Sequence, residues 1–553
     1  MDKKPLRIIP LGGLGEIGLN MMVMEYDDSI IVIDCGLMFP EDYMLGIDIV
    51  IPDVSYLVRN KDRVKAFIIT HGHEDHTGAL PFVLREINAP IYATALTVGL
   101  IENKLEEFDI LKHTSIETVR PRDLVEIGPF KVEFLRVSHS IVDGVALAVT
   151  TPVGVVVHTG DFKLDQTPVD GEVTDYARFA EYGEKGVRLL LSDSTNVEKE
   201  GYTLSEKVIG ANLEDIFAKC AGRIVVAAFS SNIHRVQQVF NTAEKFGRKV
   251  ILNGRSMVEN VRIARSLGYL NCPDGLMAEF KDLEGIAPQR VVLLTTGSQG
   301  EPMSALTRMA MDSHKQVRIQ KGDTVVLSSK FIPGHEKAIS NMMNHLYRRG
   351  AEVIYEKVSE VHVSGHASQE ELKIMLNMVR PEYFIPIHGE YRHLVRHARL
   401  AVEVGIPAAN VIVAEDGDAV EFTADGAAIK ERVEAGKVFV DGKGVGDVKD
   451  MVLKDRKHLA NDGMVIAVVA LNERSGEIIY GPDIITRGLV FEEGSEALIE
   501  GAKRTVTETL GNVSVEVKSD ALEVKEEVRR ALRRFFNQAL DRRPVILPVI
   551  FEI

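Results

Sequence analysis

The chain contains, at residues 70–78, the stretch Thr70-His71-Gly72-His73-Glu74-Asp75-His76-Thr77-Gly78. The apolar run 66–69 before it is typical of a buried strand, and residues 79–84 after it are typical of the start of a helix. Three histidines and one aspartate therefore lie on a strand-to-helix turn, where their side chains can converge. Imidazole nitrogens and carboxylate oxygens are the ligands of a catalytic Zn²⁺, at about 2.0–2.2 Å. So many ligands favour two metals; a histidine-rich surface turn is the alternative.

Length, composition and charge define the class of protein. A chain of 553 residues indicates about three or four domains, and 45% apolar with 26% charged residues is typical of a soluble protein. The sequence shows neither an apolar run long enough for a membrane span nor a signal peptide, and its three cysteines lie far apart. We therefore expect a cytoplasmic protein. The net charge of −16 argues against non-specific nucleic-acid binding but allows a locally basic channel.

The metal-ligand stretch resembles the signature of the metallo-β-lactamase superfamily. This resemblance requires further His and Asp ligands downstream, each at the end of a strand. His139 follows an expected strand at 131–137, and Asp161 follows an expected strand at 153–158. One carboxylate can offer an oxygen to each of two metals, so Asp161 is the expected bridge between them.

Residues 1–205 are expected to form the first part of this domain, an αββα sandwich of two sheets with outer helices. The pattern predicts helices at 78–87 and 97–108 and strands at 7–11, 30–34, 66–70, 91–93, 131–137, 145–150, 153–158 and 188–192. The glycine-rich stretch 12–18 is followed by a second strand-like run, 20–24. A dinucleotide-binding turn would need a helix there, so a tight hairpin is the better interpretation.

The pattern changes to alternating strands and helices after about residue 205. Strands expected at 224–229, 250–252, 291–294, 324–328 and 352–355, with helices such as 232–246 between them, predict a mostly parallel sheet over 206–360. Such sheets bind ligands in the loops at the carboxyl ends of their strands, and helix N-termini there favour phosphate. A later histidine, His388, ends another expected strand and completes the metal site. The α/β domain is therefore inserted in the sandwich, to which residues 361–440 return.

This arrangement resembles the β-CASP branch of the superfamily, whose members cut nucleic acids. Asp193, His366 and His388 match the branch's motifs A, B and C, and the histidine in motif C favours RNA over DNA. Across essentially the whole chain, the glycine-rich stretch 12–18 and the loops 231–234, 296–302 and 363–367 resemble the bacterial ribonuclease J family.

The resemblance implies a zinc-dependent ribonuclease with 5′→3′ exonuclease and endonuclease activity, preferring 5′-monophosphate ends and acting in RNA maturation and mRNA decay. Two Zn²⁺ per chain are expected, or Mn²⁺ in their place. One metal is assigned to His71, His73 and His139 and the other to Asp75, His76 and His388, with Asp161 between them. His366 is expected to be a leaving-group acid or a phosphate contact oriented by Asp193, and Asp75 also counts as catalytic. Single-stranded RNA is expected at Ser231, Asn232, His234, His362, Val363, Ser364, Gly365 and His366.

The end of the chain reads as a linker, 441–452, and a small α/β domain, 453–553. Strands are expected at 464–471, 477–480, 513–517 and 545–551 and helices near 496–510 and 521–539. Arg529, Arg530, Arg533 and Arg534 form a basic stripe that is either a solvated helix face or an RNA contact. By resemblance, this domain is associated with assembly, so a homo-oligomer (dimer or tetramer) and RNA-decay complex partners are expected, with no membrane.

The remaining expectations are a second cation site and three alternative functions. Gly46, Asp48 and Asp441 match a structural Ca²⁺ site of some ribonuclease J proteins, and Ca²⁺ prefers such oxygen ligands; ordinary turn residues are the alternative. A small-molecule metallo-hydrolase, a β-CASP DNA nuclease and a scaffold that binds RNA without cutting it are the other functions. The inserted domain and His388 argue against a small-molecule hydrolase. Comparing cleavage of matched RNA and DNA strands would distinguish a DNA nuclease from a ribonuclease.

Overall fold

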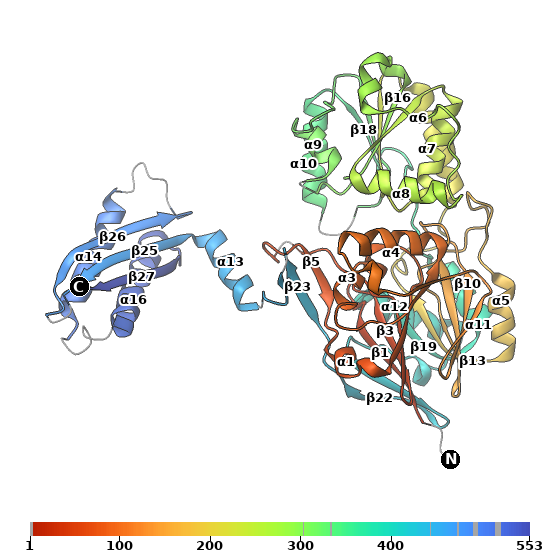
Figure 1. The fold of residues 1–553 in the computed structure, drawn as a ribbon, viewed down its shortest axis with the longest axis horizontal. Helices are drawn as coiled ribbons and strands as arrows, with labels where there is room; N and C mark the ends of the chain where they lie inside the picture. Colours follow the sequence, from red (N-terminus) through yellow and green to blue (C-terminus); the bar gives the residue numbers. More distant parts are fainter. Residues whose placement is uncertain are drawn as a thin grey trace. The chain divides into compact units, whose positions relative to one another are not determined.

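A computed structural model describes residues 4–41, 43–301, 303–331, 335–442, 444–448, 450–472, 475–489, 496–514 and 521–553 (Figure 1). The chain divides into two compact units. The first comprises Met1–Phe39 and Ile49–Val438, and the second comprises Pro40–Asp48 and Phe439–Ile553.

Two facing sheets form the sandwich of the first unit. The eight-stranded sheet has the order β22 (Gly426–Arg432), β21 (Asp418–Thr423), β1 (Leu6–Gly12), β3 (Met21–Tyr26), β4 (Ser29–Ile33), β6 (Val64–Ile68), β7 (Ile91–Thr94) and β8 (Ile116–Val119). The six-stranded sheet has the order β19 (Pro381–Ile387), β13 (Val187–Asp193), β12 (Gly154–His158), β11 (Val145–Thr151), β10 (Phe130–Arg136) and β9 (Leu124–Ile127). The sandwich that the sequence predicted is confirmed.

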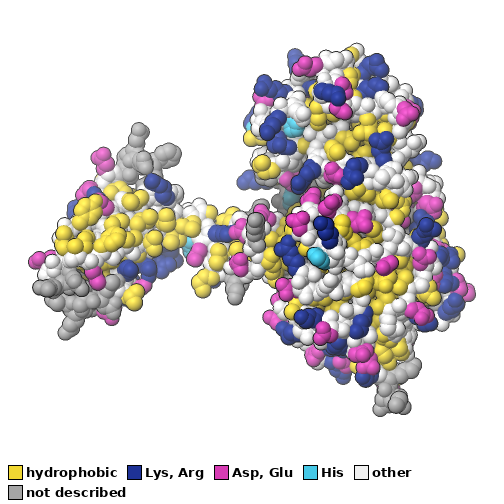
Figure 2. Space-filling model, in the orientation of Figure 1, with side chains coloured by type: hydrophobic (Ala, Val, Ile, Leu, Met, Phe, Trp, Pro, Cys, Tyr) yellow, Lys and Arg dark blue, Asp and Glu magenta, His cyan; other side chains and the backbone are white. Residues whose placement is uncertain are grey.

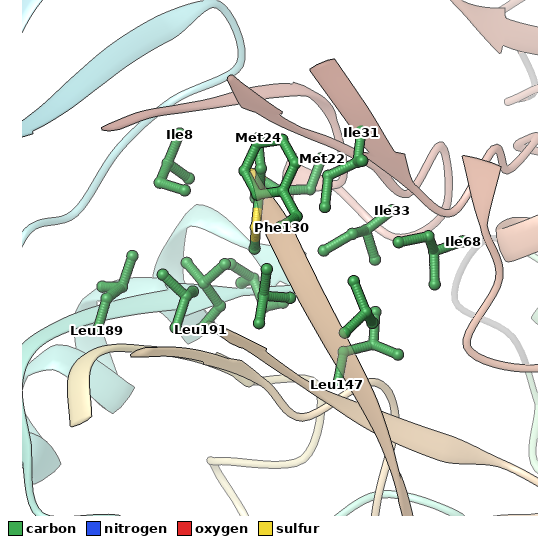
Figure 3. Close-up of a cluster of buried hydrophobic side chains, with 14 of the residues drawn as sticks. Ile8, Met22, Met24, Ile31, Ile33, Ile68, Phe130, Leu147, Leu189 and Leu191 are labelled. Carbon is green, nitrogen blue, oxygen red and sulfur yellow. The ribbon is translucent and has the colours of Figure 1, made fainter. Parts of the chain in front are cut away.

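The core lies between these sheets because alternate residues of each strand point inward. Met22 and Met24 from β3 meet Phe130 and Leu147 of the other sheet in one buried cluster (Figure 3). Each such side chain contributes about 1.5–3 kcal/mol when it is fully buried. The short strands β2 (Leu14–Gly15), β5 (Ile49–Pro52) and β20 (Gly389–Glu390) lie outside both sheets.

The helices of the sandwich are α1 (Ser55–Arg59), α2 (Glu74–Thr77), α3 (Leu80–Val83), α4 (Ala95–Glu107), α5 (Tyr176–Lys185), α11 (Gln369–Val379) and α12 (Tyr391–Val404). The helix expected at 78–87 is shorter than predicted: α3 covers Leu80–Val83, turns follow at 84–86, and α2 before it is a separate helix. Pro81 lacks the N–H that a continuous helix would donate to the carbonyl of Thr77. The hairpin expected around residues 12–18 is confirmed, since β1 and β3 pair antiparallel.

A parallel sheet forms the centre of the inserted domain, as predicted. Its order is β15 (Lys249–Asn253), β16 (Val291–Thr295), β14 (Ile224–Ala227), β17 (Thr324–Leu327) and β18 (Glu352–Ile354), and every described pair is parallel. The helices of this domain are α6 (Glu206–Lys219), α7 (Ile233–Lys245), α8 (Arg255–Ser266), α9 (Ala305–Ala310) and α10 (Glu336–Arg348). After it, β19 pairs parallel with β13, so the chain has returned to the six-stranded sheet.

The second unit contains β23 (Lys437–Asp441, mostly in this unit), β24 (Gly444–Val445), α13 (Asp450–Asp462), β25 (Met464–Leu471), β26 (Ile478–Arg487), α14 (Glu496–Asn512), α16 (Ala521–Leu540) and β27 (Val545–Glu552). The expected linker 441–452 thus holds β24 and the start of α13. Of the strand expected at 513–517, residues 513–514 are not extended in a sheet, and 515–517 lie outside the described residues. Hydrophobic side chains form a band over β25 and β26 on the face that Figure 2 shows. The domain boundaries themselves stay predictions.

Candidate metal centre

The metal-ligand candidates come from the ends of five strands. β10, β12, β13 and β19 run in the same direction, because β11 is antiparallel to both β10 and β12 and the other pairs are parallel. Their carboxyl ends therefore meet at one edge of the six-stranded sheet and deliver His139, Asp161, Asp193 and His388 there. The stretch 70–78 follows β6 of the facing sheet and completes the group.

Asp161 lies at the centre of this group. Its Oδ2 is 3.2 Å from His388 Nε2 and 3.3 Å from His76 Nε2. The same oxygen is 3.7 Å from Nε2 of both His71 and His139. The predicted bridge is thus placed at the hub of four imidazoles, with one carboxylate oxygen facing all of them.

The donor atoms form three sets that share this carboxylate, with the donor atoms of each set all within 4.8 Å of one another. One set is Asp161, Asp193, His366 and His388. The other two are His71, His73, His139 and Asp161, and Asp75, His76, Asp161 and His388. The last two sets match the nitrogen and oxygen ligands that Zn²⁺ takes in catalytic sites. These two sets bring together the residues that the sequence analysis assigned to each metal, and the assignment itself stays a prediction.

Neighbouring residues turn the ring nitrogens of the histidines toward this centre. His76 Nδ1 donates to Asp34 Oδ2 at 2.8 Å, and His139 Nδ1 donates to the Gly365 carbonyl at 2.8 Å. With Nδ1 engaged in this way, Nε2 of each ring faces Asp161. Metal-binding histidines are commonly oriented in this way. The residues present therefore fit a pair of metal ions.

The charges of the centre are unbalanced without a cation. Burial holds the pKa of His71 and His139 well below the usual range and lowers that of His73 to about 4, so these rings are neutral. Burial acts in the same direction on His388, but the Asp161 carboxylate outweighs it and raises its pKa to about 9. The centre thus attracts positive charge, which protons or metal ions can supply.

His366 and Asp193 form a pair at the side of the metal ligands. His366 Nδ1 donates to Asp193 Oδ2 at 2.8 Å. The His366 side chain is 20% exposed, whereas that of Asp193 is 1% exposed. Burial would raise the pKa of Asp193, but the neighbouring His366 imidazole outweighs it and lowers that pKa. The Asp193 carboxylate therefore binds Nδ1 of the His366 ring, and Nε2 remains for substrate.

The expected RNA-binding residues have different surroundings. Ser364 Oγ accepts from the N–H of His366 at 3.1 Å and keeps its own proton to donate. His234 Nε2 lies 3.1 Å from Asp170 Oδ2. In the described part of the chain, Nδ1 of His234 and Nδ1 of His362 are buried without a hydrogen-bond partner. These atoms are available to a ligand.

Two of the other expected RNA-binding side chains, Asn232 and Val363, already have structural roles. Asn232 caps α7 by accepting from the N–H of Arg235, and Val363 packs in a hydrophobic cluster. Ser231 directly precedes that cap and is partly exposed. The N-terminus of α11 is closed by a capping box between Ser368 and Glu371. An anion would therefore have to contact hydroxyl, ring and loop N–H groups and not this helix end.

Comparisons with known proteins cover nearly the whole chain. Family models match in sequence: the metallo-beta-lactamase superfamily at residues 14–191, the beta-CASP domain of ribonuclease J at 221–346, the Zn-dependent metallo-hydrolase RNA specificity domain at 350–412, and the ribonuclease J C-terminal domain at 451–553. Ribonuclease J of Synechocystis sp. is 43% identical, covering 98% of this chain and 86% of that protein. Ribonuclease J2 of Bacillus subtilis is 42% identical and covers 99% of both.

The chain belongs to the ribonuclease J family. The family and the fold class that the sequence predicted are thereby confirmed. A crystal structure of a protein of unknown function from Enterococcus faecalis has a TM-score of 0.54 and 17% identity, covering 75% of this chain and 100% of that one. At that identity the likeness concerns the fold alone.

Sequence reasoning missed the residues that hold the ligands of this ribonuclease J family member in place. Asp34 accepts from His76 and also from the backbone N–H of Thr70, at 2.8 Å. Asn20 Nδ2 donates to the Asp75 carbonyl at 3.0 Å. Asp34 ends an expected strand, which was a usable signal. Gly365 was expected to contact RNA, but its carbonyl binds His139 Nδ1, and a Cβ at Gly365 would lie 2.7 Å from the His139 ring.

The candidate Ca²⁺ residues lie together in the second unit. Asp48 Oδ2 accepts from the N–H of Gly442 at 2.8 Å. Asp441 Oδ2 accepts from Arg456 Nη2 at 2.5 Å, and a Cβ on Gly46 would lie 2.7 Å from Nη1 of the same arginine. A guanidinium group thus occupies the place beside Asp441 where a cation was expected.

Proposed function

We propose that the chain is a zinc-dependent ribonuclease that hydrolyses phosphodiester bonds of single-stranded RNA. The observation that carries the proposal is the pair of donor sets that share Asp161, with the His366–Asp193 pair beside them. The proposal includes 5′→3′ exonuclease and endonuclease activity in RNA maturation and mRNA decay, as the family's name and domain set favour.

Each side chain has a defined task in this proposal. His71, His73 and His139 would hold one Zn²⁺ (or Mn²⁺), and Asp75, His76 and His388 the other, with Asp161 shared. The bound ions would supply Lewis acidity and a water with a pKa of about 7. His366 donates Nδ1–H to Asp193, which fixes its tautomer and leaves Nε2 to pass a proton to the leaving oxygen.

We also propose that the 5′ monophosphate of RNA is bound near Ser364. Its free hydroxyl proton and the unpartnered ring nitrogens of His234 and His362 support this site. A triphosphate carries two more phosphoryl groups and should be crowded there. Exonucleolysis should therefore prefer monophosphate ends, while internal cleavage should depend less on the end.

The finer expectations about assembly and location belong to the same proposal. A homo-oligomer and RNA-decay partners are proposed on family membership, and cytoplasmic location on the free thiols of all three cysteines. Among the residues that the structure describes, no helix has both the length and the apolar character needed to cross a membrane. A structural Ca²⁺ near Asp48 would require Arg456 to leave Asp441, so an unchanged melting temperature on adding Ca²⁺ to chelated protein would count against it.

The experiment that tests the function is digestion of 5′-labelled RNA with mono- or triphosphate ends, with and without chelator, beside a DNA strand of the same sequence. We expect metal-dependent cleavage of RNA and faster release of nucleotides from monophosphate ends. Full activity in metal-free protein would exclude the metal mechanism. Equal exonuclease rates on both ends would exclude the proposed 5′ site, and equal cleavage of DNA would favour a β-CASP DNA nuclease.

A further inference from the structure

A second concave site lies in the inserted domain, at the carboxyl end of β15 where α8 begins. It is a cavity of about 370 Å³, which is within the range of about 300–1,000 Å³ typical of small-molecule sites. Its lining includes Arg255, Arg308, Lys315, His314 and Phe280. None of these residues belongs to the metal centre or to the proposed 5′ site.

Positive charge distinguishes this cavity in a chain whose net charge is −16. Arg255, Arg308 and Lys315 contribute three cations to the lining. The carboxylate in the lining is Glu259, and it is paired with Arg262 at 2.9 Å. The cavity therefore offers an excess of positive charge to a ligand.

Arg308 gives the strongest indication that this cavity binds a ligand. Within the described residues, its Nε is buried and has no hydrogen-bond partner. A buried guanidinium N–H without an acceptor is costly, so such groups normally bind a protein oxygen, water or a ligand. Arg308 lies on α9, a few positions after the stretch 296–302 that resembles the ribonuclease J family and that the metal chemistry does not use.

The first turn of α8 adds to this site. Gly254 precedes the helix with φ of 100°, and no described side chain caps it. A Cβ at Gly254 would lie 2.5 Å from Thr296 Oγ1, so glycine is needed for the end of β15 to approach Thr296. Uncapped N–H groups at a helix start favour anions, and guanidinium groups favour phosphate oxygens.

A ring pair forms one wall of the cavity. Phe280 and His314 have centroids 6.3 Å apart. The imidazole is held in place because its Nδ1 accepts from the backbone N–H of Val317 at 3.1 Å and its Nε2 lies 3.2 Å from Asn253 Oδ1. Burial and the nearby Arg308 lower the pKa of His314, so the ring is neutral and can flank a planar base.

We propose that this cavity binds a nucleoside phosphate, with Arg308 and Lys315 on the phosphate and the Phe280–His314 wall beside the base. Two sources share this chemistry: a free mononucleotide, or one nucleotide of an RNA strand that extends beyond the metal centre. The site is separate from the proposed cleavage chemistry.

Binding to the full chain in chelator tests the proposal, because RNA cleavage is then off and the outcome does not depend on the metal centre. Titration calorimetry with AMP measures the free-nucleotide arm, and anisotropy of a 3′-labelled, 5′-hydroxyl RNA measures the strand arm. Arg308→Ala should weaken one or both by about tenfold or more. Arg318→Ala, which removes an exposed arginine outside the cavity lining, is the matched control and should change neither arm more than about twofold.

The outcomes separate the sources. Loss confined to AMP supports a free nucleotide, and loss that includes RNA supports contact with the strand. If Arg308→Ala lowers the melting temperature, Lys315→Glu decides instead, because that side chain is exposed. If both variants bind AMP and RNA as tightly as the unchanged chain, the proposal is overturned.

Discussion

Asp161 and Glu206 are both buried carboxylates of the first unit, 4% and 1% exposed, but their surroundings differ. Glu206 faces Arg235, whose Nη2 donates at 2.7 Å, and the rest of that guanidinium binds Gln238, Ser328 and the Val361 carbonyl. Asp161 faces imidazoles. Two of these rings, those of His76 and His388, also lie beside a further carboxylate, that of Asp75. The first cluster neutralises its own charge and stabilises the fold; the second needs a cation from outside, as a catalytic site does.

The largest expected effect is at the unbalanced cluster. Asp161→Ala removes the carboxylate shared by both donor sets, so the protein should lose bound Zn²⁺. Metal ions supply several kcal/mol to phosphoryl chemistry, so RNA cleavage should fall by about 10³-fold or more. Metal content by mass spectrometry and cleavage of 5′-monophosphate RNA measure this.

The matched control for Asp161→Ala is Asp62→Asn, an exposed carboxylate outside the centre. It should keep both the metal and the activity. An Asp161→Ala protein that retained two Zn²⁺ and full activity would show that this carboxylate is not a ligand.

The second prediction concerns the balanced cluster. Arg235→Met leaves Glu206 buried without its partner, which should cost about 3–5 kcal/mol in the free energy of unfolding. The double variant Arg235→Met/Glu206→Leu should recover most of that loss, since no charge is then left unpaired. Chemical denaturation of all three proteins measures this. Equal stability of the single and double variants would mean that the charge pair is not what the cluster contributes.

The contrast between these clusters also shows what the sequence could predict. The ligands in the stretch 70–78 could be recognised from residue type and spacing alone. Asp161 and His388 could then be found because each follows an expected strand. The partners that orient the ligands are set by tertiary packing: His139 and Gly365 are 226 positions apart, and His76 and Asp34 are 42 apart. Asn232 was expected to contact the substrate, but its side chain caps α7. The sequence could not separate these two roles, since asparagine is a common residue type for both.

The third prediction concerns the residue that orients His366. Asp193→Asn keeps the shape but offers the ring an amide in place of a carboxylate, so the tautomer is less firmly held. We expect kcat to fall by about 100-fold with little change in KM, since substrate contacts stay in place. Unchanged Zn²⁺ content would separate this role from metal binding. A fall in metal content of the same size as in Asp161→Ala would instead make Asp193 a ligand.

The smallest effect is expected at a third carboxylate, Asp416, which is partly buried and has a raised pKa. Burial and the neighbouring Glu16 carboxylate raise the pKa of Asp416 to about 7, while Lys437, which pairs with Glu16 at 2.7 Å, opposes the rise. Its ordinary value is 3.8. Between about pH 4 and 7 the folded chain therefore holds a proton that the unfolded chain does not, so this group destabilises the fold progressively as the pH rises through that window.

Asp416→Asn removes the charge at every pH. The variant should therefore be more stable than the unchanged chain at pH 8, by roughly 1–3 kcal/mol, and this advantage should shrink at pH 5, where Asp416 is already protonated. Urea unfolding of both proteins at the two pH values, in chelator, measures the difference. Glu102→Gln, an exposed carboxylate on α4, is the control and should show no such dependence. An advantage that is equal at both pH values would mean that Asp416 is ionised at pH 5, and the comparison would then have two kinds of carboxylate instead of three.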